Sequence, residues 1–192
     1  MLIMAMQYYL SIDAGILRTK PASRSALYLF FFYIHVSGGL VGMLIGPFQF
    51  ISSWRKKYPQ LHRWLGTAYF AGIFSSGLAG LCIAPFAMGG AVSQTGFFIL
   101  GLVWLYVTGM GLRSLLNGQF QAHGQWMIRS YALTFATIPQ RTLLLFALFT
   151  PVPFLDLYRL SAWLPWILQL ILAQWIINIQ RHKQPKLDLA MS

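Results

Sequence analysis

The sequence predicts an all-α fold, a polytopic membrane helix bundle of about five transmembrane helices. Hydrophobic residues make up 57% of the 192 residues, and only 9% are charged, against about 25% in ordinary soluble proteins. The apolar residues also fall in runs long enough to cross a bilayer. Because a bilayer offers no water to backbone polar groups, runs of this length are expected to be helices.

Most of the chain lies in these apolar runs, each of roughly 22–28 residues, enough for a hydrocarbon core of about 30 Å. The expected helices cover 26–53, 66–88, 94–116, 128–150 and 157–179. We therefore expect an interfacial segment over 1–25, a helical bundle over 26–180 and a basic cytoplasmic tail over 181–192. The short apolar opening MLIMAMQYYL leaves open a partial spanning helix within residues 1–12.

The basic residues indicate how the helices are oriented. Lys and Arg number 14 against 3 Asp and Glu, a net charge of +11. They concentrate at 55–57, around Arg113 and in the C-terminal tail, and such positive connections stay in the cytoplasm. We expect the N-terminus outside and the C-terminus in the cytoplasm. Because these residues flank apolar runs, membrane lipids are the expected partners and nucleic acid is not.

The sequence carries no catalytic motif. It has no GxSxG elbow, HExxH pair, glycine-rich phosphate loop or carboxylate pair, which argues against hydrolases and kinases. The acids Asp13, Asp156 and Asp188 lie outside the five runs, so proton transport through an embedded carboxylate is disfavoured. Cys82 is the single cysteine, which excludes an internal disulfide and a Cys-rich metal site. No catalytic residue is predicted.

Small residues recur along two of the expected helices. One ridge comprises Gly38, Gly42 and Gly46, and the other comprises Gly72, Ser76 and Gly80. In lipid such ridges let helix backbones approach closely, which predicts tight packing. A flat slot for a ring-shaped cofactor is the open alternative. The tryptophans largely cluster near expected helix ends and are expected to be interfacial anchors. The six concerned, of seven in the sequence, are Trp54, Trp64, Trp104, Trp126, Trp163 and Trp166.

Two ionisable side chains are expected inside the membrane, where such groups are costly and mark functional sites. His35 lies roughly 12 Å and Arg141 roughly 13 Å from the outer ends of their helices, so both are expected at similar depth, facing the bundle interior. Arg141 also ends a polar stripe with Ser130, Thr134 and Thr137. With no acid in any run, a ligand carboxylate or phosphate is its natural counter-ion. Snorkelling to the outer surface is the alternative.

Two further histidines lie at the cytoplasmic ends of expected helices. His62 precedes the second run and His123 precedes the fourth. Neutral imidazoles are axial ligands of haem iron, and a pair of helix-borne histidines is the least that a b-type haem requires. The alternative is that both histidines bond to loop carbonyls and lipid phosphates beside Arg63 and Arg129.

Three strings in the sequence are specific: GPFQF, HRWLG and HGQWMIRSYALT. With them, about residues 30–180 resemble the bacterial membrane family catalogued as domain of unknown function 2306. The resemblance implies a multi-pass protein of the bacterial inner membrane, with no established activity. Members usually have a further spanning segment before the His35 helix, where this chain has MLIMAMQYYL. The characteristic positions that it implies are His35, Gly46, Pro47, Gln49, Phe50, His62, Arg63, Gly66, His123, Trp126, Met127, Arg129, Ser130 and Arg141.

Two functions are compatible with these residues. The first is a membrane redox component that holds haem b or a quinone, by loose similarity to dihaem cytochrome and ferric-reductase-like bundles. In it His62 and His123 are the axial metal ligands, and His35 is a third ligand or a quinone partner. Arg129 and Arg141 then pair with haem propionates. The second is a non-enzymatic small membrane subunit or lipid-binding accessory protein that contacts other membrane subunits. Whether the chain is an enzyme stays open.

Overall fold

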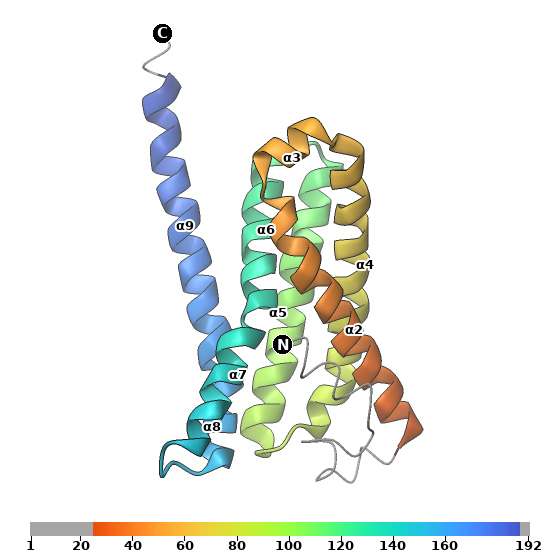
Figure 1. Ribbon diagram of the computed structural model, residues 1–192, viewed down its shortest axis with the longest axis vertical. Coiled ribbons are helices and arrows are strands. Elements are labelled where there is room, and N and C mark those ends of the chain that lie inside the picture. The colour runs from red at the N-terminus through yellow and green to blue at the C-terminus, as the bar shows by residue number, and fades with distance from the viewer. Residues whose placement is uncertain (1–24, 189–192) are drawn as a thin grey trace.

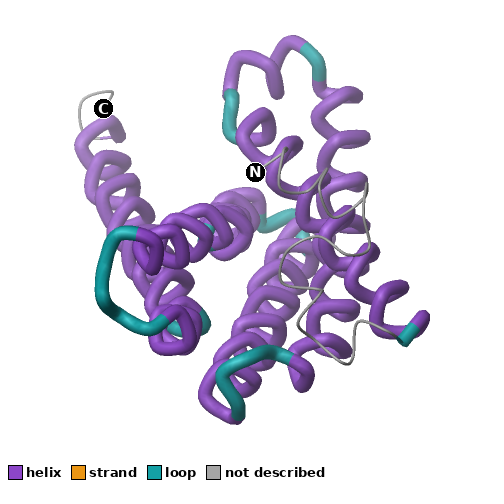
Figure 2. The backbone as a smooth tube through the Cα atoms, turned by 60° about the horizontal axis from the view of Figure 1, so that its bottom comes forward, coloured by secondary structure: helices purple, strands orange, loops and turns teal. Residues whose placement is uncertain are grey.

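All of the regular secondary structure in the described residues is helical. The computed structural model describes residues 25–188, with side-chain environments to residue 182, and Figure 2 shows these helices joined by short loops. The predicted interfacial segment, except for Ser25, lies outside the described residues. The elements are α2 (Ala26–Gln49), α3 (Ser52–Lys57), α4 (Pro59–Ile83), η3 (Ala84–Phe86), α5 (Ala91–Leu116), α6 (Phe120–Phe135), α7 (Thr137–Leu145), η4 (Phe146–Leu148), α8 (Phe154–Ser161) and α9 (Leu164–Asp188).

Four helical stretches within the described residues are long and apolar enough to cross a membrane. They are Ala26–Gln49, Pro59–Phe86, Ala91–Leu116 and Phe154–His182. The all-helical membrane class is thus confirmed, whereas the orientation in the membrane stays a prediction. The ends of the stretches differ from expectation. Helix α2 ends at Gln49, where the expected run continued to 53, and α4 begins at Pro59, where the run was expected from 66. The run expected over 157–179 divides between α8 and α9, and α9 continues to Asp188, into the predicted 181–192 tail.

The expected single helix over 128–150 is wrong. The chain there forms α6, a break at Ala136 and then α7, which continues in the same general direction (Figure 1). Pro139 explains the break, because it has no N–H to donate to the carbonyl of Phe135 and its ring crowds that carbonyl. The break places the polar residues after Ala136 on a separate short helix.

Helix α2 crosses α4 through the two ridges of small residues (Figure 1). Gly38 and Gly42 are buried. A Cβ on Gly38 would overlap the carbonyl oxygen of Gly72, and one on Gly42 would overlap the side chain of Ile73. The predicted close packing of these ridges is confirmed, and it brings the backbones together around His35.

Two tryptophans expected at the membrane interface lie instead in the bundle core. Trp104 and Trp166 are each only 8% exposed and belong to the main buried cluster. Each ring N–H is satisfied internally: Trp104 Nε1 donates to Thr134 Oγ1 at 3.1 Å, and Trp166 Nε1 donates to the carbonyl of Ala162 at 2.8 Å. An indole whose N–H has a partner can be buried without an unsatisfied donor.

Candidate functional site: a cavity shared by His35 and Arg141

The two embedded ionisable residues line the same cavity. Its volume is about 270 Å³, and its walls come from α2, α4, α5, α6, α7, α8 and α9. His35 enters from α2 and Arg141 from α7. The expectation that both side chains face the bundle interior therefore agrees with the structure. Small-molecule pockets usually measure about 300–1,000 Å³, so this one suits a single ring with its substituents.

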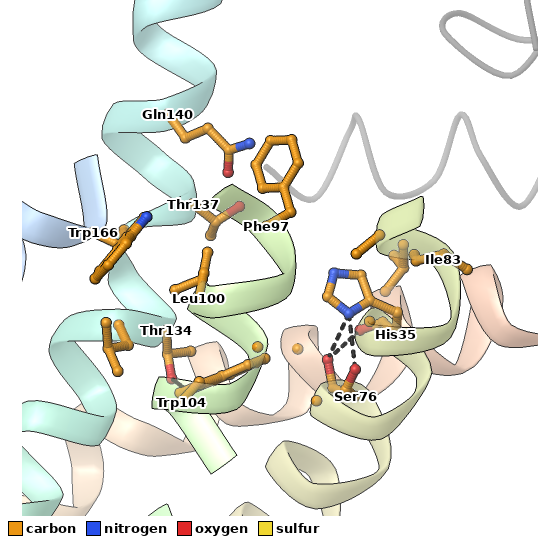
Figure 3. Close-up of a pocket in the computed structure, with 18 of the residues that line it drawn as sticks. His35, Ser76, Ile83, Phe97, Leu100, Trp104, Thr134, Thr137, Gln140 and Trp166 are labelled. Carbon is orange, nitrogen blue, oxygen red and sulfur yellow. Dashed lines mark hydrogen bonds between the residues drawn. The ribbon is translucent and has the colours of Figure 1, made fainter. Parts of the chain in front are cut away.

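His35 is held in one orientation by Ser76 of α4. Its Nδ1 lies 2.9 Å from the carbonyl oxygen of Ser76 and 3.3 Å from the Ser76 hydroxyl oxygen. The Ser76 hydroxyl donates to the carbonyl oxygen of His35 at 2.7 Å. Because a carbonyl oxygen only accepts, the hydrogen-bond network assigns the ring proton to Nδ1. Nε2 lies on the other side of the ring from Ser76, where the cavity is (Figure 3).

The environment of the cavity favours a neutral His35. No Asp or Glu is among the described residues that line it, while Arg141 already contributes a positive charge. A second cation beside Arg141 in an apolar space would be repelled and poorly solvated. With Nδ1 carrying the proton, Nε2 of the neutral ring presents a lone pair.

Arg141 contributes hydrogen-bond donors to the cavity from α7. Among residues 25–182, whose side chains the structure describes, its side chain has no hydrogen-bond or ion-pair partner. The guanidinium has five N–H donors in a planar fork and no acceptor. Thr137 and Gln140 of the same short helix also line the cavity, and Figure 3 shows both side chains on its α7 side.

The remaining walls are largely apolar and aromatic. The residues concerned include Phe32, Met43, Ile83, Phe97, Leu100, Trp104 and Trp166. Gly39, Gly77 and Gly101 also line the cavity, where absent side chains leave room. The cavity thus combines an apolar body with polar groups at two places, a lining typical of small-molecule sites.

A buried hydrogen-bond network supports one wall of the cavity. Thr134 lines the cavity and accepts from Trp104. The Tyr69 hydroxyl lies 3.3 Å from Thr134 Oγ1 and 2.9 Å from Ser130 Oγ, and Ser130 Oγ lies 2.7 Å from Thr108 Oγ1. All five side chains are buried. Because each polar group has a partner, the network can hold α4, α5 and α6 in one arrangement.

His62 and His123 lie at the other end of the bundle, at the starts of α4 and α6. His123 Nδ1 lies 2.9 Å from the carbonyl oxygen of Gly111, which assigns the proton to Nδ1 and leaves Nε2 free to accept. A small space of about 10 Å³ adjoins His62 and Gln49 but not His123, room for about one water. No group of three or more potential metal ligands occurs among the described residues.

Arg129 lies away from the cavity. It donates to Gln174 Oε1 of α9 at 2.7 Å, and its guanidinium stacks 4.7 Å from the Trp126 ring. The hydrogen bond to Gln174 joins α6 to α9, whereas the stacking contact with Trp126 lies within α6. The five predicted site residues therefore divide among three places, and whether any of them binds a cofactor stays a prediction. The sequence did not reveal two residues of this site. Ser76, the partner of His35, was noted only as a member of a small-residue ridge. Gln140, which lines the cavity, directly precedes Arg141.

Comparison with known proteins agrees with the resemblance seen in the sequence. The model of the family described as predicted membrane protein DUF2306 matches residues 32–177. No curated protein and no solved structure matches this chain. The match covers α2 from Phe32 through most of α9 and includes both His35 and Arg141.

Proposed function

We propose that this chain, which belongs to the DUF2306 family of predicted membrane proteins, binds a membrane quinone in the cavity between His35 and Arg141. A bound quinone would make it a component of membrane electron transfer. The observation that carries the proposal is a fixed imidazole and a guanidinium on one apolar cavity inside the bundle, the guanidinium having no partner among the described side chains.

A quinone matches this lining chemically. Its flat ring suits the aromatic and glycine-containing walls, and its ring oxygens are the polar groups that need partners. The Arg141 guanidinium can donate to one oxygen without leaving another described group unpaired, because it has no partner among the side chains of residues 25–182. A volume of about 270 Å³ accommodates the ring, and an isoprenoid tail would extend among the acyl chains.

Tryptophan fluorescence provides a direct test. Trp104 and Trp166 line the cavity, so a short-tailed benzoquinone added to the purified protein should quench their emission with a saturating dependence. Arg141→Gln should weaken binding about tenfold or more, since a hydrogen bond from a charged donor contributes about 1.5–3 kcal/mol. Arg113→Gln is the matched control, because Arg113 is exposed on α5 and lies outside the cavity.

Two outcomes would overturn the proposal. One is non-saturating quenching by both the benzoquinone and its hydroquinone, which random collision in detergent produces, and the other is equal weakening by Arg141→Gln and Arg113→Gln. Two results together would favour a lipid-binding accessory protein instead. An anionic phospholipid would displace the quinone saturably, and neither Trp104→Phe nor Trp166→Phe would change the quenching by the quinone.

A b-type haem held by His62 and His123 is the second candidate. The observation that favours it is the His123 Nδ1 contact with the Gly111 carbonyl, because metal-binding imidazoles commonly donate their other N–H to a carbonyl. It ranks second because the space beside His62 is about 10 Å³, so a porphyrin would have to separate α4 from α6. Expression with ample haem tests it: a Soret band that either His62→Ala or His123→Ala removes is the expected result, and a colourless wild-type protein contradicts it.

A further inference from the structure

His35 and Arg141, which both line the cavity, differ in what they offer a ligand. We infer that the cavity selects the reduced, quinol form of its ligand over the oxidised quinone, because His35 Nε2 requires a hydroxyl donor while Arg141 requires an acceptor oxygen. The inference rests on the proposed function and adds to it the chemical form that the site prefers.

The Ser76 carbonyl determines the polarity on the His35 side. Since Nδ1 donates to that carbonyl at 2.9 Å, the neutral ring has its lone pair at Nε2. A ligand hydroxyl can donate to that lone pair. A quinone carbonyl cannot, because it is itself only an acceptor and would set two lone pairs against each other.

The Arg141 guanidinium has the opposite requirement. A guanidinium only donates, so the ligand oxygen there must accept. A quinone carbonyl and a quinol hydroxyl both meet this condition, since a hydroxyl oxygen accepts as well as donates. Thr137 and Gln140 can each donate or accept, so they do not distinguish the two forms. Among these four residues, only His35 therefore distinguishes the quinol from the quinone.

Two probes separate the forms without redox chemistry. Para-methoxyphenol has one hydroxyl donor, and its methyl ether, para-dimethoxybenzene, has acceptor oxygens only. Calorimetric titration of wild-type protein in nanodiscs should show the phenol binding about tenfold more tightly, since the ether leaves Nε2 without its hydrogen bond. His35→Phe keeps a ring of similar size and should reduce the ratio of the two Kd values to about one.

The matched control is Ser75→Ala, at the next position along α4. Ser75 is bonded within its own helix, to the carbonyl oxygens of Ala71 and Gly72, and does not line the cavity. This variant should keep the wild-type ratio. Loss of the ratio in Ser75→Ala would contradict the assignment of selectivity to His35.

The tautomer can be measured independently of binding. Nitrogen NMR of protein labelled at histidine, with the His35 signals assigned from the His35→Phe difference, should show Nδ1 protonated and Nε2 unprotonated. An Nε2-protonated ring would overturn the inference. Equal binding of phenol and ether in wild-type protein would also overturn it, while saturable benzoquinone binding would leave the proposed function standing. Failure of benzoquinone and both probes to bind would instead refute the proposed function.

Discussion

His35 and Ser76 are joined in both directions across the α2–α4 contact: Nδ1 of His35 lies 2.9 Å from the Ser76 carbonyl oxygen, and the Ser76 hydroxyl donates to the His35 carbonyl oxygen at 2.7 Å. The pair lies between Gly38 and Gly80, where small residues let the two helices approach. The orientation of the imidazole in the cavity is therefore a consequence of how this helix pair packs.

Gly80→Ala should displace the His35 ring without changing any polar residue of the cavity. The new Cβ would lie 2.9 Å from Nδ1 and 3.2 Å from Cε1 of His35, so the ring must move from the Ser76 carbonyl. We expect several-fold weaker quinone binding and altered His35 nitrogen shifts. Gly66→Ala, also on α4, is the control, since its Cβ would meet Gln49 Oε1 at an ordinary 3.5 Å. Unchanged His35 shifts in Gly80→Ala would refute this prediction.

Gly38→Ala should destabilise the bundle. A Cβ there would overlap the backbone carbonyl of Gly72, which cannot move without separating α2 from α4, and overpacking of this kind costs about 1–3 kcal/mol. Gly109→Ala, on α5, meets nothing within 4 Å and should be neutral or slightly stabilising because alanine favours helix. Thermal unfolding in detergent compares them, and equal Tm values would show that the ridge does not limit helix approach.

Tyr69→Phe should lower stability by about 1–2 kcal/mol, because the buried hydroxyl oxygens of Ser130 and Thr134 lose a partner. Tyr106→Phe removes the same atom from a residue that is 62% exposed and should change the free energy of unfolding by less than about 0.5 kcal/mol. Denaturation in matched detergent micelles measures both. A smaller loss in Tyr69→Phe than in Tyr106→Phe would contradict a structural role for the network.

The orientation predicted from the basic residues can be tested by cysteine labelling. Cys82 is the single cysteine and is exposed, so a Cys82→Ala background is needed. In intact cells an impermeant thiol reagent should label Ala91→Cys and should leave Gln60→Cys unlabelled until the membrane is opened, because Arg55, Lys56 and Lys57 retain the Gln60 side in the cytoplasm. The reverse labelling pattern would show that the bundle has the opposite orientation in the membrane.

Sequence alone was sufficient for the features that lipid imposes locally. A span must be long, apolar and helical, so the four spanning stretches were located. Their ends were not, because α4 begins at Pro59 instead of 66 and the run expected over 157–179 divides between α8 and α9. The two small-residue ridges, one containing Gly38 and the other Gly72, could also be predicted, because close approach in lipid depends on residue size at helical spacing. The cost of burying charge singled out His35 and Arg141 before their surroundings were known.

Tertiary structure decided which residues meet. His35 and Ser76 are 41 positions apart, and nothing in either helix alone indicates that the Ser76 carbonyl fixes the imidazole. The burial of Trp104 and the contact of Arg129 with Gln174 depend equally on which face of one helix meets another. Because lipid tails are as apolar as a bundle interior, hydrophobicity does not distinguish an inward face from an outward one. Only the interhelical contacts make that distinction.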